Sequence, residues 1–212
     1  MSIPVTVIDY GIGNLLNMVR ALEHCGAAVQ VVARATPEAA QASRLVLPGV
    51  GAFGDGMAEL RARGLDDTVR NFAATGRPFL GICVGLQMMF EDSEEMGTHA
   101  GLGLLQGRVL AVPVTRADGQ PHRVPHIGWR PLQAARAWDD TILSEVQAGE
   151  RAYFVHSFTA EPRDPAVRLA DVDYDGRRLC AAVQRGNLTG CQFHPERSAG
   201  AGLGMLRRFL AL

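Results

Sequence analysis

The feature that most constrains the fold is an apolar run that ends in a cysteine between two glycines. Residues 77–83 (RPFLGIC) carry no charge after Arg77, and the chain then passes through Val84 and Gly85 into the segment 84–92 (VGLQMMFED). An uninterrupted apolar run is typical of a parallel strand covered on both faces, and parallel strands are joined by crossovers that are usually helical. The segment therefore predicts a strand, a tight turn and a helix.

The first half of the chain repeats this alternation. Apolar runs alternate with segments of helical spacing, the strands being expected at 5–11, 28–33, 44–51 and 77–83 and the helices at 14–26, near Pro37, at 55–74 and at 84–92. After Gly97 short strands separated by turn residues follow, with a brief helix near 139–147, a strand at 188–196 and a closing helix at 202–212. We expect an α/β fold with a mixed, mostly parallel central sheet and flanking helices.

Length and charge restrict the classes of function. A chain of 212 residues with 47% hydrophobic residues suits a single domain spanning 1–212, and a net charge of −1 offers no long-range attraction to nucleic acid or to an anionic membrane. The first residues lack the basic and apolar regions of a secretory signal, and no run of about 18 apolar residues is present. A cytoplasmic location with four reduced cysteines is expected.

Cys83 has the setting of an enzymatic nucleophile. The sequence Gly81-Ile82-Cys83-Val84-Gly85 has the form of a nucleophile elbow, in which glycines flank the nucleophile because the turn from strand to helix is too tight for larger side chains. Unpaired N–H groups at the start of the helix favour the thiolate. The alternative is that Cys83 is a small buried hydrophobic residue, which is how most free cysteines are used.

His194 is the histidine best placed to serve this nucleophile. In CQFHPER, period-two alternation puts Gln192, His194 and Glu196 on one face of the expected strand, so the carboxylate can accept the second ring N–H of the imidazole. The alternative is an ion pair at a strand end. His122 and His126 are four apart, but Pro121 and Pro125 exclude a helix there, and we expect neither a metal site nor a cofactor.

Backbone N–H groups near the elbow can stabilise an oxyanion. Pro48-Gly49-Val50-Gly51 ends the third expected strand with amides that no sheet partner need use, and the Val84 N–H directly follows the nucleophile. The candidate donors are Val50, Gly51 and Val84. Together with the cysteine and the histidine they predict attack by Cys83 on a carbonyl carbon, with His194 moving the proton.

With these residues in view, the sequence resembles the class I (triad-type) glutamine amidotransferases, and most closely the glutaminase subunits of imidazole glycerol phosphate synthase. The resemblance covers nearly the full chain and rests on motifs in this order: IDYGIGN, LPGVGAF, GICVGLQMMF, SEE, VPHIGW, YFVHSF and QFHPERS. It implies a flavodoxin-like fold and a triad of Cys83, His194 and Glu196 that hydrolyses L-glutamine to glutamate and ammonia through a thioester.

The same resemblance implies the residues that hold glutamine. Gly51, Gln87 and Glu95 match substrate positions, with the Glu95 carboxylate opposite the α-ammonium, while His156, Ser157 and Phe158 match the segment that receives the α-carboxylate. Read without the family, Gln87 is a polar residue on the elbow helix and Glu95 a solvated loop carboxylate. Phe158 stands where this subunit usually has tyrosine, so a phenolic donor is missing.

A partner is also implied, namely a (β/α)8-barrel cyclase that receives the ammonia within a heterodimer. The contact region with the cyclase is matched by residues near Asn14, by the Gly-Trp turn at Trp129 and Arg130, and by Arg197 after HPE. Arg130 replaces the usual asparagine, and Arg197 replaces the commoner lysine. Trp129 could instead pack in the core.

Three other functions remain open at this stage. A paralogous glutaminase subunit would supply ammonia to a synthetase that amidates a sugar acid for surface polysaccharide, with identical active-site motifs. A binding or regulatory module that had lost activity would not need the intact triad and glycine turns. A cysteine hydrolase of γ-glutamyl peptides would share the elbow but would not explain PHIGW or YFVHS.

Overall fold

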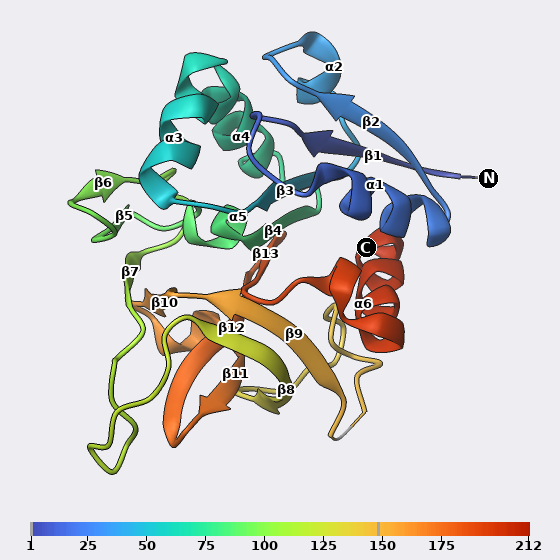
Figure 1. Ribbon diagram of the computed structural model, residues 1–212. Coiled ribbons are helices and arrows are strands. Elements are labelled where there is room, and N and C mark those ends of the chain that lie inside the picture. The colour runs from blue at the N-terminus through green and yellow to red at the C-terminus, as the bar shows by residue number, and fades with distance from the viewer. Residues whose placement is uncertain (1, 148) are drawn as a thin grey trace.

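A single nine-stranded sheet runs through both halves of the chain. The computed structural model describes residues 2–147 and 149–212. The sheet has the strand order β2-β1-β3-β4-β13-β12-β11-β8-β9 (Figure 1). Its strands are β1 (Ile3–Ile8), β2 (Ala27–Val32), β3 (Leu45–Gly49), β4 (Phe79–Cys83), β8 (His126–Ala134), β9 (Arg151–His156), β11 (Arg168–Tyr174), β12 (Arg177–Arg185) and β13 (Leu188–Cys191).

The two halves of this sheet differ in direction. The pairs from β2 through β1, β3 and β4 to β13 are parallel, whereas those from β13 through β12, β11 and β8 to β9 are antiparallel. β3 and β4 are buried along their whole length, as expected for strands covered on both faces. The prediction of a mixed sheet is confirmed, but it is parallel only in one half because the β-rich second half joins the same sheet.

A smaller sheet lies beside the large one. It has the order β10-β7-β5-β6 and consists of β5 (Asp92–Ser93), β6 (His99–Ala100), β7 (Gly107–Ala111) and β10 (Phe158–Pro162). Only Ser157 separates β9 from β10, so the chain crosses from one sheet to the other at that residue. The junction of the two sheets therefore contains the segment His156–Phe158.

The helices cover the parallel half of the sheet. They are α1 (Leu15–His24), α2 (Pro37–Ala40), α3 (Phe53–Ala62), α4 (Leu65–Ala73), α5 (Val84–Gln87) and α6 (Ala199–Ala211), with 3₁₀ helices η1 (Pro165–Val167) and η2 (Pro195–Arg197). α1 and α6 lie together on one side of the parallel strands, and α3 and α4 lie on the other (Figure 1). Within the described ranges, no helix has the length and apolar character needed to span a membrane.

Two expectations about local structure are wrong. The segment 139–147 forms successive turns instead of a helix, because N–H groups such as those of Ser144 and Val146 bond to carbonyls three residues back. The strand expected at 188–196 ends at Cys191, and the chain enters η2 at Pro195. Proline lacks an N–H and fixes φ near −65°, which suits the first turn of a helix better than a strand interior.

Candidate active site

Cys83 lies at the point where β4 turns into α5. It is the last residue of β4 and the N-cap of α5, with φ of 53°, a value that non-glycine residues rarely adopt. A Cβ on Gly81 would lie 2.8 Å from the carbonyl oxygen of Gly85, and one on Gly85 would collide with the backbone of Leu47 in β3. The two glycines are therefore required because α5 folds back directly onto its own strand and onto β3.

His194 and Glu196 form a buried pair, although by a different route from the expected one. His194 Nδ1 lies 2.8 Å from Glu196 Oε1, and both side chains are almost fully buried. The alternation of a strand does not bring them together, since the strand has ended and Glu196 lies in η2. His194 is held by its backbone: its N–H donates to the Tyr153 carbonyl, and its carbonyl accepts from the Ser198 hydroxyl.

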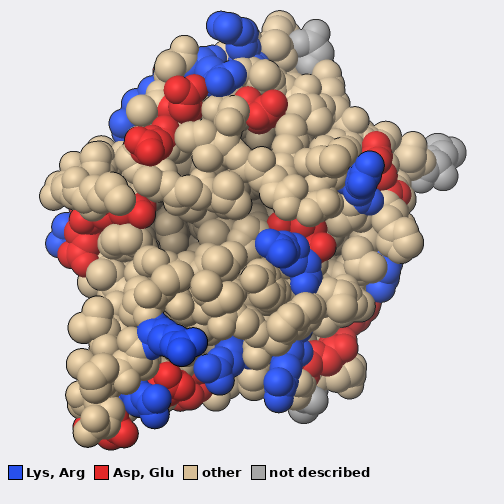
Figure 2. All heavy atoms as spheres, in the orientation of Figure 1, with Lys and Arg blue, Asp and Glu red and all other residues tan. Residues whose placement is uncertain are grey.

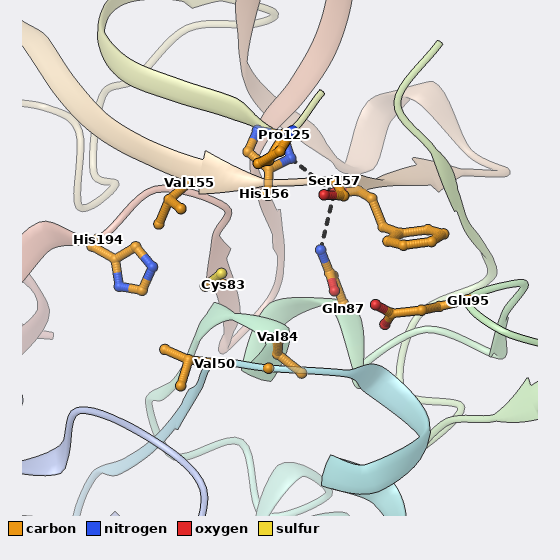
Figure 3. A pocket seen from close by; sticks show the side chains of 12 residues that line it. Val50, Cys83, Val84, Gln87, Glu95, Pro125, Val155, His156, Ser157 and His194 are labelled. Atoms are coloured by element: carbon orange, nitrogen blue, oxygen red, sulfur yellow. Dashed lines mark hydrogen bonds between the residues drawn. The ribbon is translucent and has the colours of Figure 1, made fainter. Parts of the chain in front are cut away.

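The His194 imidazole points from this turn toward Cys83 (Figure 3). Burial alone would lower its pKa, but the adjacent Cys83 side chain and the hydrogen bond and charge of Glu196 outweigh burial and raise the pKa to about 10. His194 Nε2 is buried and makes no hydrogen bond to any of the described residues. The raised pKa favours the imidazolium form of the ring, whose Nε2 proton can be given to a group that enters between His194 and Cys83.

A cavity of about 260 Å³ opens at this point. It is lined by Val50, Gly51, Cys83, Val84, Gln87, Glu95, Pro125, Val155, His156, Ser157, Phe158 and His194. The hollow near the centre of the face in Figure 2 lies between the parallel strands above and β9 and β10 below. Every expected oxyanion and substrate residue thus lines one cavity with Cys83 and His194, while Glu196 lies behind the imidazole.

The expected oxyanion donors lie beside the nucleophile. Val50 and Val84 are on the same side of Cys83 in the close view (Figure 3), and Gly51 has φ of 85°, which favours glycine. Gly49 is confined as well, because a Cβ there would lie 2.5 Å from Tyr10 Oη. The turn after β3 is therefore shaped by glycine next to the elbow.

Glu95 occupies the opposite end of the cavity from His194. Its Oε2 accepts a hydrogen bond of 2.7 Å from the N–H of Phe53, the first residue of α3. A carboxylate at a helix N-terminus is stabilised by the free N–H groups and the helix dipole. Glu95 therefore supplies a fixed negative charge at this end of the cavity.

A hydrogen-bond network connects Gln87 to the turn between the two sheets. Gln87 Nε2 donates to the Phe158 carbonyl at 3.0 Å, and His156 Nδ1 donates to the same carbonyl at 2.8 Å (Figure 3). His126 Nδ1 lies 2.9 Å from His156 Nε2. Burial is the first cause that lowers the pKa of His126 to about 3 and that of His156 to about 4, so both rings are neutral at neutral pH.

Two residues of this network were missed by sequence reasoning. His126 had been considered only as half of a metal pair, and Gln192 had been placed on the face of His194 without a role. Gln192 Nε2 lies 3.6 Å from Cys83 Sγ, and its Oε1 accepts a 3.0 Å hydrogen bond from Gln87. The shared face of Gln192 and His194 was the available signal. For His126 the sequence offered none, since its contact with His156 follows from the pairing of β8 with β9.

The expected partner residues do not form one patch. Trp129 is 45% exposed and contacts Tyr153, with ring centroids 5.8 Å apart, and the Arg197 guanidinium lies 4.8 Å from the same tyrosine ring. Arg130 is on the other face of β8 and points toward Tyr174, as alternation along a strand requires. Trp129 is thus a surface residue grouped with Arg197 and not with Arg130.

Asn14 is also exposed, next to the start of α1. Among residues 2–147 and 149–212, no group of three or more His, Cys, Asp and Glu side chains is arranged to hold a metal ion.

Comparison with known proteins gives consistent matches. The family model described as glutamine amidotransferase class I matches residues 6–211. The chain is 47% identical to the imidazole glycerol phosphate synthase subunit HisH 1 of Legionella pneumophila (strain Lens), covering 98% of this chain and 99% of the relative. It is 46% identical to the subunit HisH of Rhodopirellula baltica, over 97% of this chain and 96% of the relative. The solved structure of PurLQS from Thermotoga maritima has a similar fold, with a TM-score of 0.73, 22% identity and coverage of 100% of this chain and 98% of that chain.

Proposed function

This chain belongs to the class I glutamine amidotransferase family, and we propose that Cys83, His194 and Glu196 are the residues with which it hydrolyses glutamine. Its function is that of the glutaminase subunit of imidazole glycerol phosphate synthase, in histidine biosynthesis. The observation that carries the residue assignment is the position of Cys83, which is held at the strained turn of an elbow and faces an imidazole bonded to a buried carboxylate.

The geometry supports a two-step hydrolysis. The Cys83 thiolate attacks the side-chain carboxamide carbon of glutamine, and the oxygen of that carboxamide takes up negative charge beside the backbone amides of Val50, Gly51 and Val84. The C–N bond then breaks as His194 donates a proton to the departing nitrogen, which leaves as ammonia. Water, deprotonated by His194, attacks the resulting thioester, so that glutamate leaves and the thiolate returns. Glu196 keeps the imidazole oriented throughout.

The charges around the cavity support glutamine as the substrate. A free amino acid carries one positive and one negative group, and Glu95 offers a carboxylate for the α-ammonium. The turn at His156, Ser157 and Phe158 lies across the cavity and receives the α-carboxylate in this proposal. Both amide protons of Gln87 are already used by the Phe158 carbonyl and by Gln192, so Gln87 offers the substrate its carbonyl oxygen.

The proposed partner is a (β/α)8-barrel cyclase that accepts the ammonia. An exposed tryptophan beside an arginine is a common anchor in protein interfaces, and Trp129, Tyr153 and Arg197 provide such a group. The Tyr153 carbonyl also accepts the N–H of His194, so this surface lies directly behind the catalytic base. Ammonia becomes protonated in water and is then no nucleophile, so direct transfer into a docked partner is expected.

Transfer of ammonia to a sugar-acid synthetase would need the same residues in the same places. The relatives described above are named as subunits of imidazole glycerol phosphate synthase, which favours the cyclase as acceptor. Arg130 does not argue for the other acceptor, because it lies against Tyr174 and Asp175 on the opposite face of β8 from Trp129.

The experiment that tests the function is co-expression of the chain with a barrel cyclase from the same genome, followed by pull-down and measurement of glutamate release. We expect the cyclase to co-purify and glutamine hydrolysis to depend on it. If a sugar-acid synthetase bound and stimulated hydrolysis while the cyclase did neither, the acceptor would be wrong. Replacing Trp129 by alanine should weaken the complex, with replacement of the exposed Arg185, on β12, as the matched control.

A further inference from the structure

Gln192 contacts the reactive sulfur and has no place in the mechanism described above. Its side chain is fully buried, and its Nε2 lies 3.6 Å from Cys83 Sγ. The residue follows directly after the end of β13, the strand that pairs with β4 in parallel and so runs beside the elbow. A buried primary amide has two donors and one acceptor oxygen, and which end faces the sulfur decides what it can do.

The hydrogen-bond network fixes the orientation of this amide. The Phe158 carbonyl can only accept, so the atom of Gln87 that faces it at 3.0 Å is the amide nitrogen. The second proton of that nitrogen points to Gln192 at 3.0 Å, where it requires an acceptor, so this end of Gln192 is the carbonyl oxygen. The Gln192 nitrogen is consequently turned toward Cys83 as a donor.

The Phe158 carbonyl is itself held in place from the other side. His156 Nδ1 donates to it at 2.8 Å, which leaves His156 Nε2 as an acceptor for the N–H of His126 at 2.9 Å. Only one direction of hydrogen-bond donation satisfies every group of this network. His126 donates to His156, and His156 donates to the Phe158 carbonyl. Gln87 donates to that carbonyl and to Gln192. The donor at the sulfur therefore depends on residues from β8, β9, α5 and the segment after β13.

A donor at this position serves the chemistry of a buried thiolate. Cys83 is only 5% exposed, so a negative charge on its sulfur has lost most of its water and must be stabilised by the protein. Hydrogen bonds to charged groups are stronger than those between neutral groups. The same N–H also limits the directions from which the sulfur can approach the carboxamide carbon.

From this geometry we propose that Gln192 is a catalytic residue that donates an amide hydrogen bond to the Cys83 sulfur, stabilising the thiolate and aligning it for attack. The proposal rests on the function of Cys83 as the nucleophile. Gln192 would stabilise the thiolate both before attack and when it is released from the thioester. It adds a side-chain donor to an elbow otherwise served by backbone amides and by His194.

The test measures the reactivity of Cys83 without glutamine. The intact chain, alone and in complex with the cyclase, is treated with iodoacetamide across about pH 5 to 9, and the alkylation of each cysteine is followed by mass spectrometry. For Gln192→Met we expect alkylation of Cys83 at neutral pH to be about tenfold slower and the midpoint of its pH profile to move up by roughly one unit. Gln192→Glu, which places an acceptor and a charge at the sulfur, should move the midpoint further.

Control variants separate a role at the sulfur from a role in folding. Gln133→Met, on an exposed position of β8, should leave the profile unchanged, and the partly exposed Cys25 should react equally in all variants. Gln192→Leu likewise has neither an N–H nor a charge at the sulfur, so it should reproduce the shift. This variant also supplies the measurement if Gln192→Met does not fold.

An unchanged midpoint in Gln192→Met and Gln192→Leu would overturn the role of Gln192. That result is distinguishable from failure of the proposed function, which would appear as glutamine hydrolysis by a Cys83→Ala complex whatever residue stands at position 192.

Discussion

Gly85→Ala perturbs the contact that shapes the elbow. A Cβ at this position would lie 2.9 Å from the carbonyl carbon of Leu47 and closer still to its oxygen. Ordinary carbon–carbon contact begins near 3.5 Å, so α5 and β3 must separate by at least about 0.6 Å. Both neighbours are backbone in a fully buried strand, which cannot move aside as a flexible side chain can. Overpacking of this kind costs about 1 to 3 kcal/mol, which lowers the melting temperature of a domain this size by roughly 3 to 10 °C.

The same displacement moves the nucleophile, because Cys83 lies two residues before Gly85. A shift of about 1 Å at a reacting group can reduce the rate roughly 100-fold. The assay combines thermal unfolding with glutamate release by the complex. Gly200→Ala is the matched control, since a Cβ there meets nothing within 4 Å on α6, and it should be neutral or stabilising by up to about 1 kcal/mol. If Gly85→Ala matched this control in both measurements, the steric explanation of the glycine pattern would be refuted.

Three further predictions follow from titration and from the surface. Glu196→Gln removes a hydrogen bond and a charge that help to hold the pKa of His194 at about 10. The pH above which kcat/KM for glutamine declines should therefore be lower in this variant. If that pH did not change, the result would contradict the pairing of His194 with Glu196. The pKa values of His126 and His156 are depressed below 6.5, so the unfolded chain binds more protons than the folded chain below that pH. The free energy of unfolding should therefore fall from about pH 6.5 toward 4, by up to roughly 1.4 kcal/mol per pH unit for each histidine. Urea unfolding of His126→Phe should show a shallower fall, and a slope equal to that of the unaltered chain would be evidence against the depressed pKa of His126. Trp129→Ala should raise the Kd for the cyclase at least about tenfold, as titration calorimetry would measure, without changing the melting temperature of the free chain.

The elbow was predictable because part of its cause is local. The contact between Gly81 and Gly85 arises within five consecutive residues, and the apolar run before them is enough to indicate a buried strand. The contact of Gly85 with Leu47 crosses to β3 and could not be predicted from the motif alone. The α/β class followed from repetition of the same pattern. The share of parallel strands was overestimated because nothing local in the β-rich half shows whether it continues the main sheet or forms another.

The pairing of His194 with Glu196 was predicted from a strand that does not extend to these residues. Strand alternation and the turn into η2 both bring residues two apart to one side, so the contact was expected although Pro195 ends the extended chain. Gln192 and His126 show the limit of sequence reasoning. Gln192 meets Cys83 across 109 positions and His126 meets His156 across 30, and such contacts are set by strand order and register.

The central claim is that Cys83 is the nucleophile that releases ammonia from glutamine, and the most direct test is a Cys83→Ala chain in complex with the cyclase. Glutamate release and cyclase turnover are measured with glutamine and then with added ammonia. The account predicts that glutamate release and glutamine-supported turnover are lost, whereas ammonia-supported turnover equals that of the unaltered complex. Glutamate release by the Cys83→Ala complex at a rate close to that of the unaltered complex would contradict it.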